Sequence, residues 1–195
     1  MDPLLLRVYQ QQVLYQCEFL LLAARDINAG LQARQVTRVF YGVQNFLNAA
    51  ANIAKALWGQ GGRWAAERQD LRASLGIAED SPLRSVTMRN NFEHFDDRLE
   101  TWWRDSKHHN YVDLNIGSTS RVTVTDPVDR FRLFDPVTTD LYFWSQAFNL
   151  QALTNEVQRI LPPLRGAVNT PHSGREPASP GEEANGSLPD GARGG

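Results

Sequence analysis

The sequence predicts a mainly α-helical protein: a helical bundle with a small antiparallel β-hairpin extension and a disordered C-terminal tail. Apolar residues recur with helical spacing over about the first hundred residues and then alternate with polar ones between about 111 and 144. No aromatic residue follows Gly166, and glycine and proline become frequent there. We therefore expect one helical domain over 1–162, which includes the β extension at about 111–144, and a disordered tail over 163–195.

The first helix has recognisable ends. Asp2 is a favourable N-cap, Pro3 suits the first helical position, and Gly30 is expected to stop the helix. Apolar side chains of residues 4–28 cover more than half of the helix circumference. We therefore expect this helix to be buried on several sides, as in the middle of a bundle.

The second helix shows the clearest periodicity in the chain. Its apolar residues recur at three- and four-residue steps from Val36 to Leu57, and Gly59 is expected to end it. Gly42 lies inside this helix, which suggests that a neighbouring helix comes close. The loop at 59–62 contains three glycines, but it lacks the preceding strand and the following lysine of a phosphate-binding loop, so we interpret it as a turn.

The third major helix is expected from about Ser81 to Arg104, with Ser81 as N-cap and Pro82 at the first helical position. At 100° per residue, one arc of this helix collects apolar residues that we expect to form its core stripe. The stripe consists of Met88, Phe92, Phe95, Leu99, Trp102 and Trp103.

The opposite face of the same helix would carry Asn90, His94 and Asp97. Asn90 and His94 are four residues apart, and His94 and Asp97 are three apart, so the carboxylate is placed to hydrogen-bond the imidazole. Arg89 lies on the flank of this face, where its guanidinium could reach the same site or pair with Glu93 at i+4. An ordinary solvated helix face carrying ion pairs would show the same residues.

These residue types suit metal-independent cleavage of RNA, whose nucleophile is the ribose 2′-OH. The reaction needs a base for that proton, an acid for the leaving 5′-oxygen and a cation for the developing phosphorane charge. The imidazole of a histidine such as His94 can act as acid or base, and Arg89 can bind a phosphate through two nitrogens. The amide of Asn90 could hold the ribose or the scissile phosphate.

The segment Arg89-Asn90-Asn91-Phe92-Glu93-His94 resembles the R-x4-6-H signature of the HEPN superfamily, in which a polar residue commonly follows the arginine. Two long N-terminal helices followed by the signature on a later helix also resemble that family, over about residues 1–105. The resemblance implies a HEPN-like all-α bundle, a homodimer that brings two motifs together, and often RNA cleavage in toxin or defence settings. Arg89 and His94 would then be the catalytic pair, with Asn90 and Asp97 as accessory polar groups.

The same spacing recurs from Arg104 to His109 and from Arg165 to His172. We place the motif at Arg89–His94 because this copy lies inside a well-patterned helix. The function expected is therefore a metal-independent endoribonuclease with an RNA substrate. The alternative is a non-catalytic HEPN-like interaction or regulatory module that binds a protein partner or a nucleotide.

Two hairpins and a last helix are expected after the third helix. The first hairpin would join Tyr111–Ile116 to Val122–Val124, and the second would join Phe131–Phe134 to Leu141–Trp144, although the latter segment could instead begin a helix. Asn149 should cap a final helix that ends at Pro162-Pro163.

Cofactor, metal and membrane signals are weak in this sequence. His94, His108 and His109 lack the helical spacing that holds a metal ion on one face, so we expect no metal site and no cofactor. The lone Cys17 is expected to be a buried thiol. The longest apolar run is far shorter than the roughly 20 residues that span a bilayer, and the N-terminus makes a poor signal peptide. We therefore expect a cytoplasmic protein with a net charge of −2 and no membrane contact.

Overall fold

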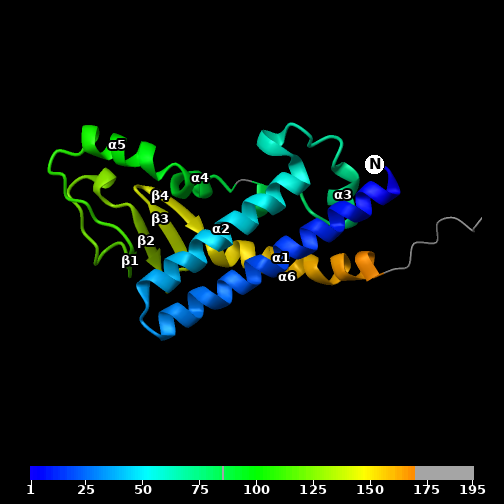
Figure 1. The fold of residues 1–195 in the computed structure, drawn as a ribbon, viewed down its shortest axis with the longest axis horizontal. Coiled ribbons are helices and arrows are strands. Elements are labelled where there is room, and N and C mark those ends of the chain that lie inside the picture. Colours follow the sequence, from blue (N-terminus) through cyan, green and yellow to red (C-terminus); the bar gives the residue numbers. More distant parts are fainter. Residues whose placement is uncertain (85, 170–195) are drawn as a thin grey trace, which may run out of the picture.

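A computed structural model describes residues 1–84 and 86–169 of the chain (Figure 1). Its α-helices are α1 (Pro3–Gln32), α2 (Val36–Trp58), α3 (Gln69–Ser74), α4 (Met88–Glu93), α5 (Phe95–Asp105) and α6 (Leu150–Asn169). Its strands are β1 (Asn115–Ile116), β2 (Arg132–Asp135), β3 (Asp140–Phe143) and β4 (Gln146–Asn149). The expectation of a mainly helical protein with a small sheet is confirmed. The part of the expected tail over 170–195 lies outside the described residues.

Helices α1 and α2 form a long antiparallel hairpin, and α6 packs against α1 (Figure 1). The N-cap of α1 is confirmed, because Asp2 accepts hydrogen bonds from the backbone N–H groups of Leu4 and Leu5 at 2.9 and 3.1 Å. Gly30 does not stop α1, which continues to Gln32. A Cβ at Gly30 would lie 2.8 Å from the backbone nitrogen of Val39, so this glycine permits close approach of the two helices.

The close approach expected at Gly42 is confirmed. A Cβ at this position would lie 2.9 Å from Ile27 Cγ1 and 3.1 Å from the carbonyl oxygen of Ala23. The prediction that α1 is buried on several sides is confirmed only in part, because α2 and α6 cover it while a row of apolar side chains along it stays exposed. The described elements that cover α1 are chiefly α2 and α6, which leave one of its faces open.

The expected continuous helix from Ser81 to Arg104 is wrong, because the segment is divided into three pieces. A 3₁₀ turn lies at Pro82–Arg84 and is followed by α4. His94 then interrupts the helix between α4 and α5, because its backbone angles (φ −104°, ψ 44°) are not helical. The two helices dock at different places: Phe92 of α4 packs against Phe143, with ring centroids 6.3 Å apart, whereas Trp102 of α5 donates a hydrogen bond to Asp129 at 2.9 Å. The break allows both contacts to form.

This break also divides the expected core stripe. Met88 and Phe92 are buried, whereas Leu99 and Trp102 are only half-buried. Phe95 and Trp103 are 55% and 64% exposed, so the prediction that they belong to the core is wrong. No residue of α5 is buried, because this helix lies on the outside of the molecule and has few close neighbours.

The sheet has the strand order β1-β2-β3-β4. The hairpin of β2 and β3 is confirmed, with Leu133 opposite Tyr142, and β4 adds a further antiparallel strand. The expected hairpin from Tyr111 to Val124 is wrong: only Asn115–Ile116 form a strand, and this strand pairs with β2 in parallel. The sheet therefore extends to Asn149, beyond the expected limit of 144.

Helix α6 begins as expected, because Asn149 Oδ1 accepts a hydrogen bond from the backbone N–H of Ala152 at 2.8 Å. Its expected end at Pro162-Pro163 is wrong, and so is the expected disorder of residues 163–169, since the helix continues to Asn169. Both prolines are exposed, so water can bond the carbonyl groups that lose their N–H partners. Leu161 and Leu164 are buried on the opposite side and hold the helix against the core.

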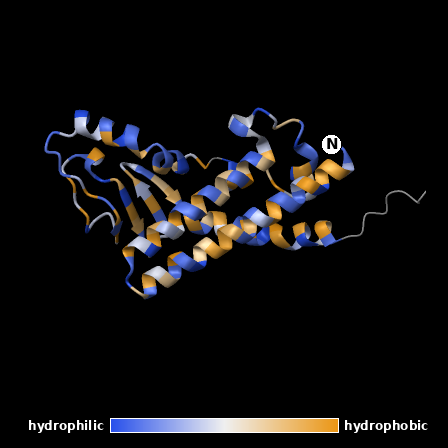
Figure 2. Ribbon diagram, in the orientation of Figure 1, coloured by the Kyte–Doolittle hydropathy of each residue, from blue (hydrophilic) through white to orange (hydrophobic). Residues whose placement is uncertain are grey.

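One hydrophobic core joins α1, α2 and α6 with the inner side of the sheet. Its largest fully buried side chains include Phe46 of α2, Leu20 of α1, Phe143 of β3 and Ile160 of α6. Figure 2 shows hydrophobic residues along all three helices and the strands. This shared core fixes the end of α2 relative to the segment that carries Arg89 and Asn90.

Candidate functional site: a basic pocket at the end of α2

A pocket of about 580 Å³ lies at the C-terminal end of α2. Its walls come from the last two turns of α2, the glycine-containing loop at 59–62, and the segment from Arg84 to Asn90. Among the described residues that line it, the charged ones are Lys55, Arg84 and Arg89, and all are basic. The pocket is therefore suited to an anionic group.

The C-terminus of a helix is a poor place for an anion, because its free carbonyl groups carry partial negative charge. Here arginines satisfy these carbonyls. Arg68 Nη1 donates to the carbonyl oxygens of Lys55 and Ala56 at 2.5 and 2.7 Å, and Arg72 Nη1 donates to that of Leu57 at 2.9 Å. Two guanidinium groups thus offset the negative end of α2 beneath the pocket.

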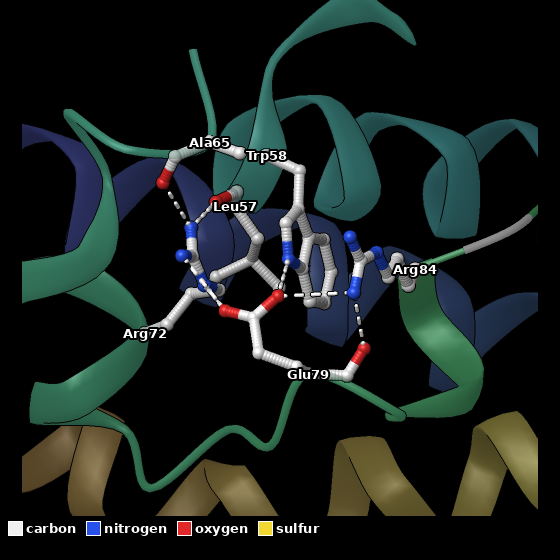
Figure 3. Close-up of polar contacts among 6 residues, drawn as sticks. All are labelled: Leu57, Trp58, Ala65, Arg72, Glu79 and Arg84. Carbon is white, nitrogen blue, oxygen red and sulfur yellow. Dashed lines mark hydrogen bonds and ion pairs between the residues drawn. The ribbon is translucent and has the colours of Figure 1, made fainter. Parts of the chain in front are cut away.

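A polar network supports one wall of the pocket (Figure 3). Arg72 is only 6% exposed, and besides Leu57 it donates to the carbonyl oxygen of Ala65 at 2.7 Å. Its guanidinium forms a salt bridge with Glu79 at 2.9 Å, and Glu79 in turn binds Arg84 at 3.0 Å. Figure 3 shows Glu79 between the two arginines, with the indole of Trp58 beside them. The network holds Arg84 and Trp58 in place at the pocket.

The same network keeps Glu79 ionised. Desolvation raises the pKa of its carboxyl, but hydrogen bonds from Trp58 and Arg72 and the charges of Arg72 and Arg84 outweigh this effect. The result is a pKa below the ordinary value for glutamate. Arg84 thus has a carboxylate partner outside the pocket lining, whereas Lys55 forms no ion pair within the described part of the chain.

The structure brings Arg89 and Asn90 to this pocket, where both line the wall. Arg89 also forms the ion pair with Glu93 at i+4, with a separation of 2.9 Å between Nη2 and Oε2. Asn90 is exposed and accepts a longer contact of 3.5 Å from Arg89. Arg89 therefore belongs to the pocket and at the same time has an acidic partner on its own helix.

His94 is placed differently. It lies at the break between α4 and α5, and its backbone N–H donates to the carbonyl of Asn90 at 3.0 Å. Its side chain is exposed, is not among the residues that line the pocket, and forms no hydrogen bond within residues 1–84 and 86–169. The imidazole does not bind Asp97, which lies in the first turn of α5, where a carboxylate favours the positive end of the helix.

Sequence reasoning missed Lys55, Arg84 and the contribution of the loop at 59–62 to the pocket. Lys55 belongs to the predicted second helix and Arg84 to the predicted third, and neither carries a motif. The loop is indeed a turn, with positive φ at Gly59, Gly61 and Gly62, yet it also forms a wall. Only the packing of α2 beside the segment after Ser81 brings these residues together.

Within residues 1–84 and 86–169, no group of three or more histidine, cysteine, aspartate or glutamate side chains is arranged to hold a metal ion. In the same part of the chain, no helix has the length and apolar content needed to cross a bilayer. Comparison of the chain with models of protein families, with curated proteins and with solved structures gave no match.

Proposed function

We propose that the protein binds RNA through its phosphates at the basic pocket and cleaves it as a metal-independent endoribonuclease. The observation that carries the proposal is the pocket itself: Arg89 and Asn90 line it together with Lys55 and Arg84, and no acidic side chain is among the described lining residues. Phosphate contacts from arginine and lysine supply most of the sequence-independent affinity for nucleic acid.

The proposed roles follow from the chemistry of each group. Arg89 binds the scissile phosphate and stabilises the charge that develops as the 2′-oxygen attacks phosphorus and the 5′-oxygen leaves. Lys55 and Arg84 bind neighbouring phosphates, and Asn90 holds the ribose or a phosphate oxygen. His94, four residues beyond Asn90, either accepts the proton of the 2′-hydroxyl or donates a proton to the leaving 5′-oxygen, and water carries out the other transfer. The products are a 2′,3′-cyclic phosphate and a free 5′-hydroxyl.

Two features of α4 affect this proposal. The pair of Arg89 with Glu93 must open or be shared when phosphate binds, which weakens binding relative to a free arginine. His94 is exposed at a helix break, where its backbone is not held by regular helical geometry. The proposed chemistry needs only the groups of one chain, so the homodimer that the family resemblance implies is not required for it.

A second function is favoured by the position of His94 outside the pocket lining. In this case the pocket binds a nucleotide or another phosphate-bearing partner without cleaving it, and His94 is an ordinary exposed residue. Both proposals require the basic side chains, but only the first requires the imidazole.

The deciding experiment incubates the full chain with single-stranded RNA in excess EDTA and identifies the product ends. Ribonuclease function predicts 2′,3′-cyclic phosphate ends that disappear in His94→Ala and persist in the matched control His108→Ala, another exposed histidine. Cleavage that survives His94→Ala, or no cleavage across varied RNAs, contradicts the first proposal.

RNA binding is measured in parallel over a range of salt concentrations. Lys55→Ala should weaken binding and reduce the salt slope by about one. Binding that is lost in Lys55→Ala but retained in His94→Ala, with no cleavage by any variant, supports the second proposal. Binding that is indifferent to Lys55 and Arg89 contradicts both.

A further inference from the structure

Helix α1 exposes apolar residues in a regular row. Between residues 6 and 24, the exposed residues follow one another at alternating steps of four and three positions. With Leu5 one step earlier, this row, here called the α1 stripe, consists of Leu5, Val8, Gln12, Tyr15, Phe19 and Leu22. The five apolar members are 45–52% exposed.

This pattern is the reverse of that on an ordinary surface helix, which places polar residues toward solvent. Alternating steps of three and four give an average repeat of 3.5 residues, the spacing at which two helices pack side by side along a shared seam. From Leu5 to Leu22 the stripe is roughly 26 Å long, at 1.5 Å per residue. A contiguous exposed apolar row of this kind indicates a binding surface.

We propose that the α1 stripe pairs with the α1 stripe of a second copy of the chain, in an antiparallel and symmetric dimer. In this arrangement each stripe residue faces a stripe residue of the second copy, and the two residue numbers of every facing pair add up to 27. Leu5 then faces Leu22 of the second copy, and Val8 faces Phe19. The single polar residue, Gln12, faces Tyr15, whose hydroxyl group can bond its amide. Each of these contacts occurs twice because of the symmetry.

Charges along α1 favour the antiparallel direction. In a parallel pair the position four residues after Leu22 would bring the two Asp26 carboxylates together, each of which pairs with Arg38 of its own chain at 3.0 Å. In the antiparallel pair Asp26 lies near the positive N-terminal end of the second copy's α1, and the two helix dipoles oppose each other. Glu18 then flanks Gln11, and Arg25 flanks Leu4, so no like charges meet.

A groove beside the stripe enlarges the surface. It has a volume of about 440 Å³ and lies between α1 and α2, with Phe19 and Leu22 on one side and Tyr41, Asn45 and Asn48 on the other. Tyr41 is 63% exposed. Asparagines line the α2 side of this groove, and no lysine or arginine is among its described lining residues. Lysines and arginines attract helices to anionic membranes, so the groove suits a protein surface better than a lipid surface.

This inference does not rest on the proposed function. None of the stripe residues lines the basic pocket, so each copy of the dimer keeps a complete pocket of its own. The arrangement differs from the one that the family resemblance implies, in which two motifs meet at the interface.

The oligomeric state of the full chain tests the proposal by sedimentation or light scattering over a range of concentrations. We expect twice the chain mass of 22.0 kDa for the wild type and a single chain mass for Phe19→Glu. Phe95→Glu is the matched control, because Phe95 is also about half exposed but lies on α5, and it should remain dimeric. A wild type that stays monomeric to about 100 μM, or a dimer that survives Phe19→Glu, overturns the proposal.

Cysteine cross-linking tests the direction of pairing. Mild oxidation of a mixture of Val8→Cys and Phe19→Cys proteins should link one variant to the other. Neither variant should link to itself, because two copies of residue 8 would lie roughly 16 Å apart along the seam. The native Cys17 does not interfere, since it is fully buried. Self-linking of Val8→Cys alone would show parallel pairing and overturn the antiparallel dimer.

Discussion

The buried guanidinium of Arg72 forms a salt bridge with Glu79 at 2.9 Å and donates to the carbonyl groups of Leu57 and Ala65. One side chain therefore joins the end of α2, the loop after it and the segment before the 3₁₀ turn at Pro82. The shape of the basic pocket depends on this joint, because Trp58 and Arg84 are held through the same carboxylate. Two predictions concern the contacts of Arg72 and Glu79, and two concern the packing of α1 against α2.

Replacing Arg72 by methionine should destabilise the protein by about 2–4 kcal/mol, because the buried carbonyl group of Leu57 and the half-buried carbonyl group of Ala65 lose their donor. Denaturant unfolding followed by circular dichroism measures the change. The control Arg104→Met removes an arginine that is 70% exposed and should cost less than about 0.5 kcal/mol. Equal effects of the two substitutions would show that the contacts of Arg72 with Leu57, Ala65 and Glu79 do not stabilise the fold.

Stability should fall in acid partly through Glu79. Its pKa is lower in the folded protein than the ordinary 4.5, so its contribution is present above that pH and is lost as the pH falls through the folded value. Glu79→Gln should reduce the loss of stability between about pH 5 and 3, whereas Glu67→Gln, at an exposed site, should not. Thermal unfolding across this pH range measures the difference, and identical pH profiles for Glu79→Gln and the wild type would contradict it.

Cys17 should be unreactive in the folded protein. Burial, helped by the charge of Glu18, raises the pKa of its thiol from 9.0 to about 12, so the reactive thiolate is scarce. This neutral thiol contributes stability below pH 9, and the contribution is lost as the pH rises toward 12. An alkylating reagent at pH 8 should label Cys17 only in denaturant, as mass spectrometry would show. Rapid labelling of the native protein would mean that α1 is not packed as described.

Gly42→Ala should destabilise the protein by about 1–3 kcal/mol, although alanine is the better helix former by about 1 kcal/mol. The added methyl group would press on Ile27 and on the backbone of Ala23, so α1 and α2 would have to separate. Gln44→Ala, at an exposed position of the same helix, is the control and should be nearly neutral. A stabilised Gly42→Ala variant would show that the two helices are not in close contact there.

Local signals in the sequence were enough for much of the fold. The N-caps at Asp2 and Asn149 and the end of α2 at Gly59 were predicted correctly, because each depends on residues within one helical turn. The β2–β3 hairpin was also predicted, because its two strands and the turn between them are close in the sequence. The helical spacing of apolar residues in α2 likewise needs no knowledge of distant parts of the chain.

Where distant contacts compete with local preference, the sequence was a poor guide. Nothing in the sequence around His94 marks a helix break, since neither glycine nor proline is present. The break is fixed by Phe92 and Trp102, which dock on partners in the later β segment. Conversely, two prolines did not end α6, because Leu161 just before them and Leu164 just after them are both buried.

The sequence by itself determined the presence of α1 and α2, the caps at Asp2 and Asn149, and the helical position of Arg89 and Asn90 five and four residues before His94. Only the tertiary structure decided that these two residues join Lys55 and Arg84 in a pocket, that His94 lies outside its lining, and that α1 keeps an apolar row exposed. The physical reason is range. Helix propensity and capping act between neighbouring residues, whereas a pocket or an uncovered face depends on which distant segments the core brings together.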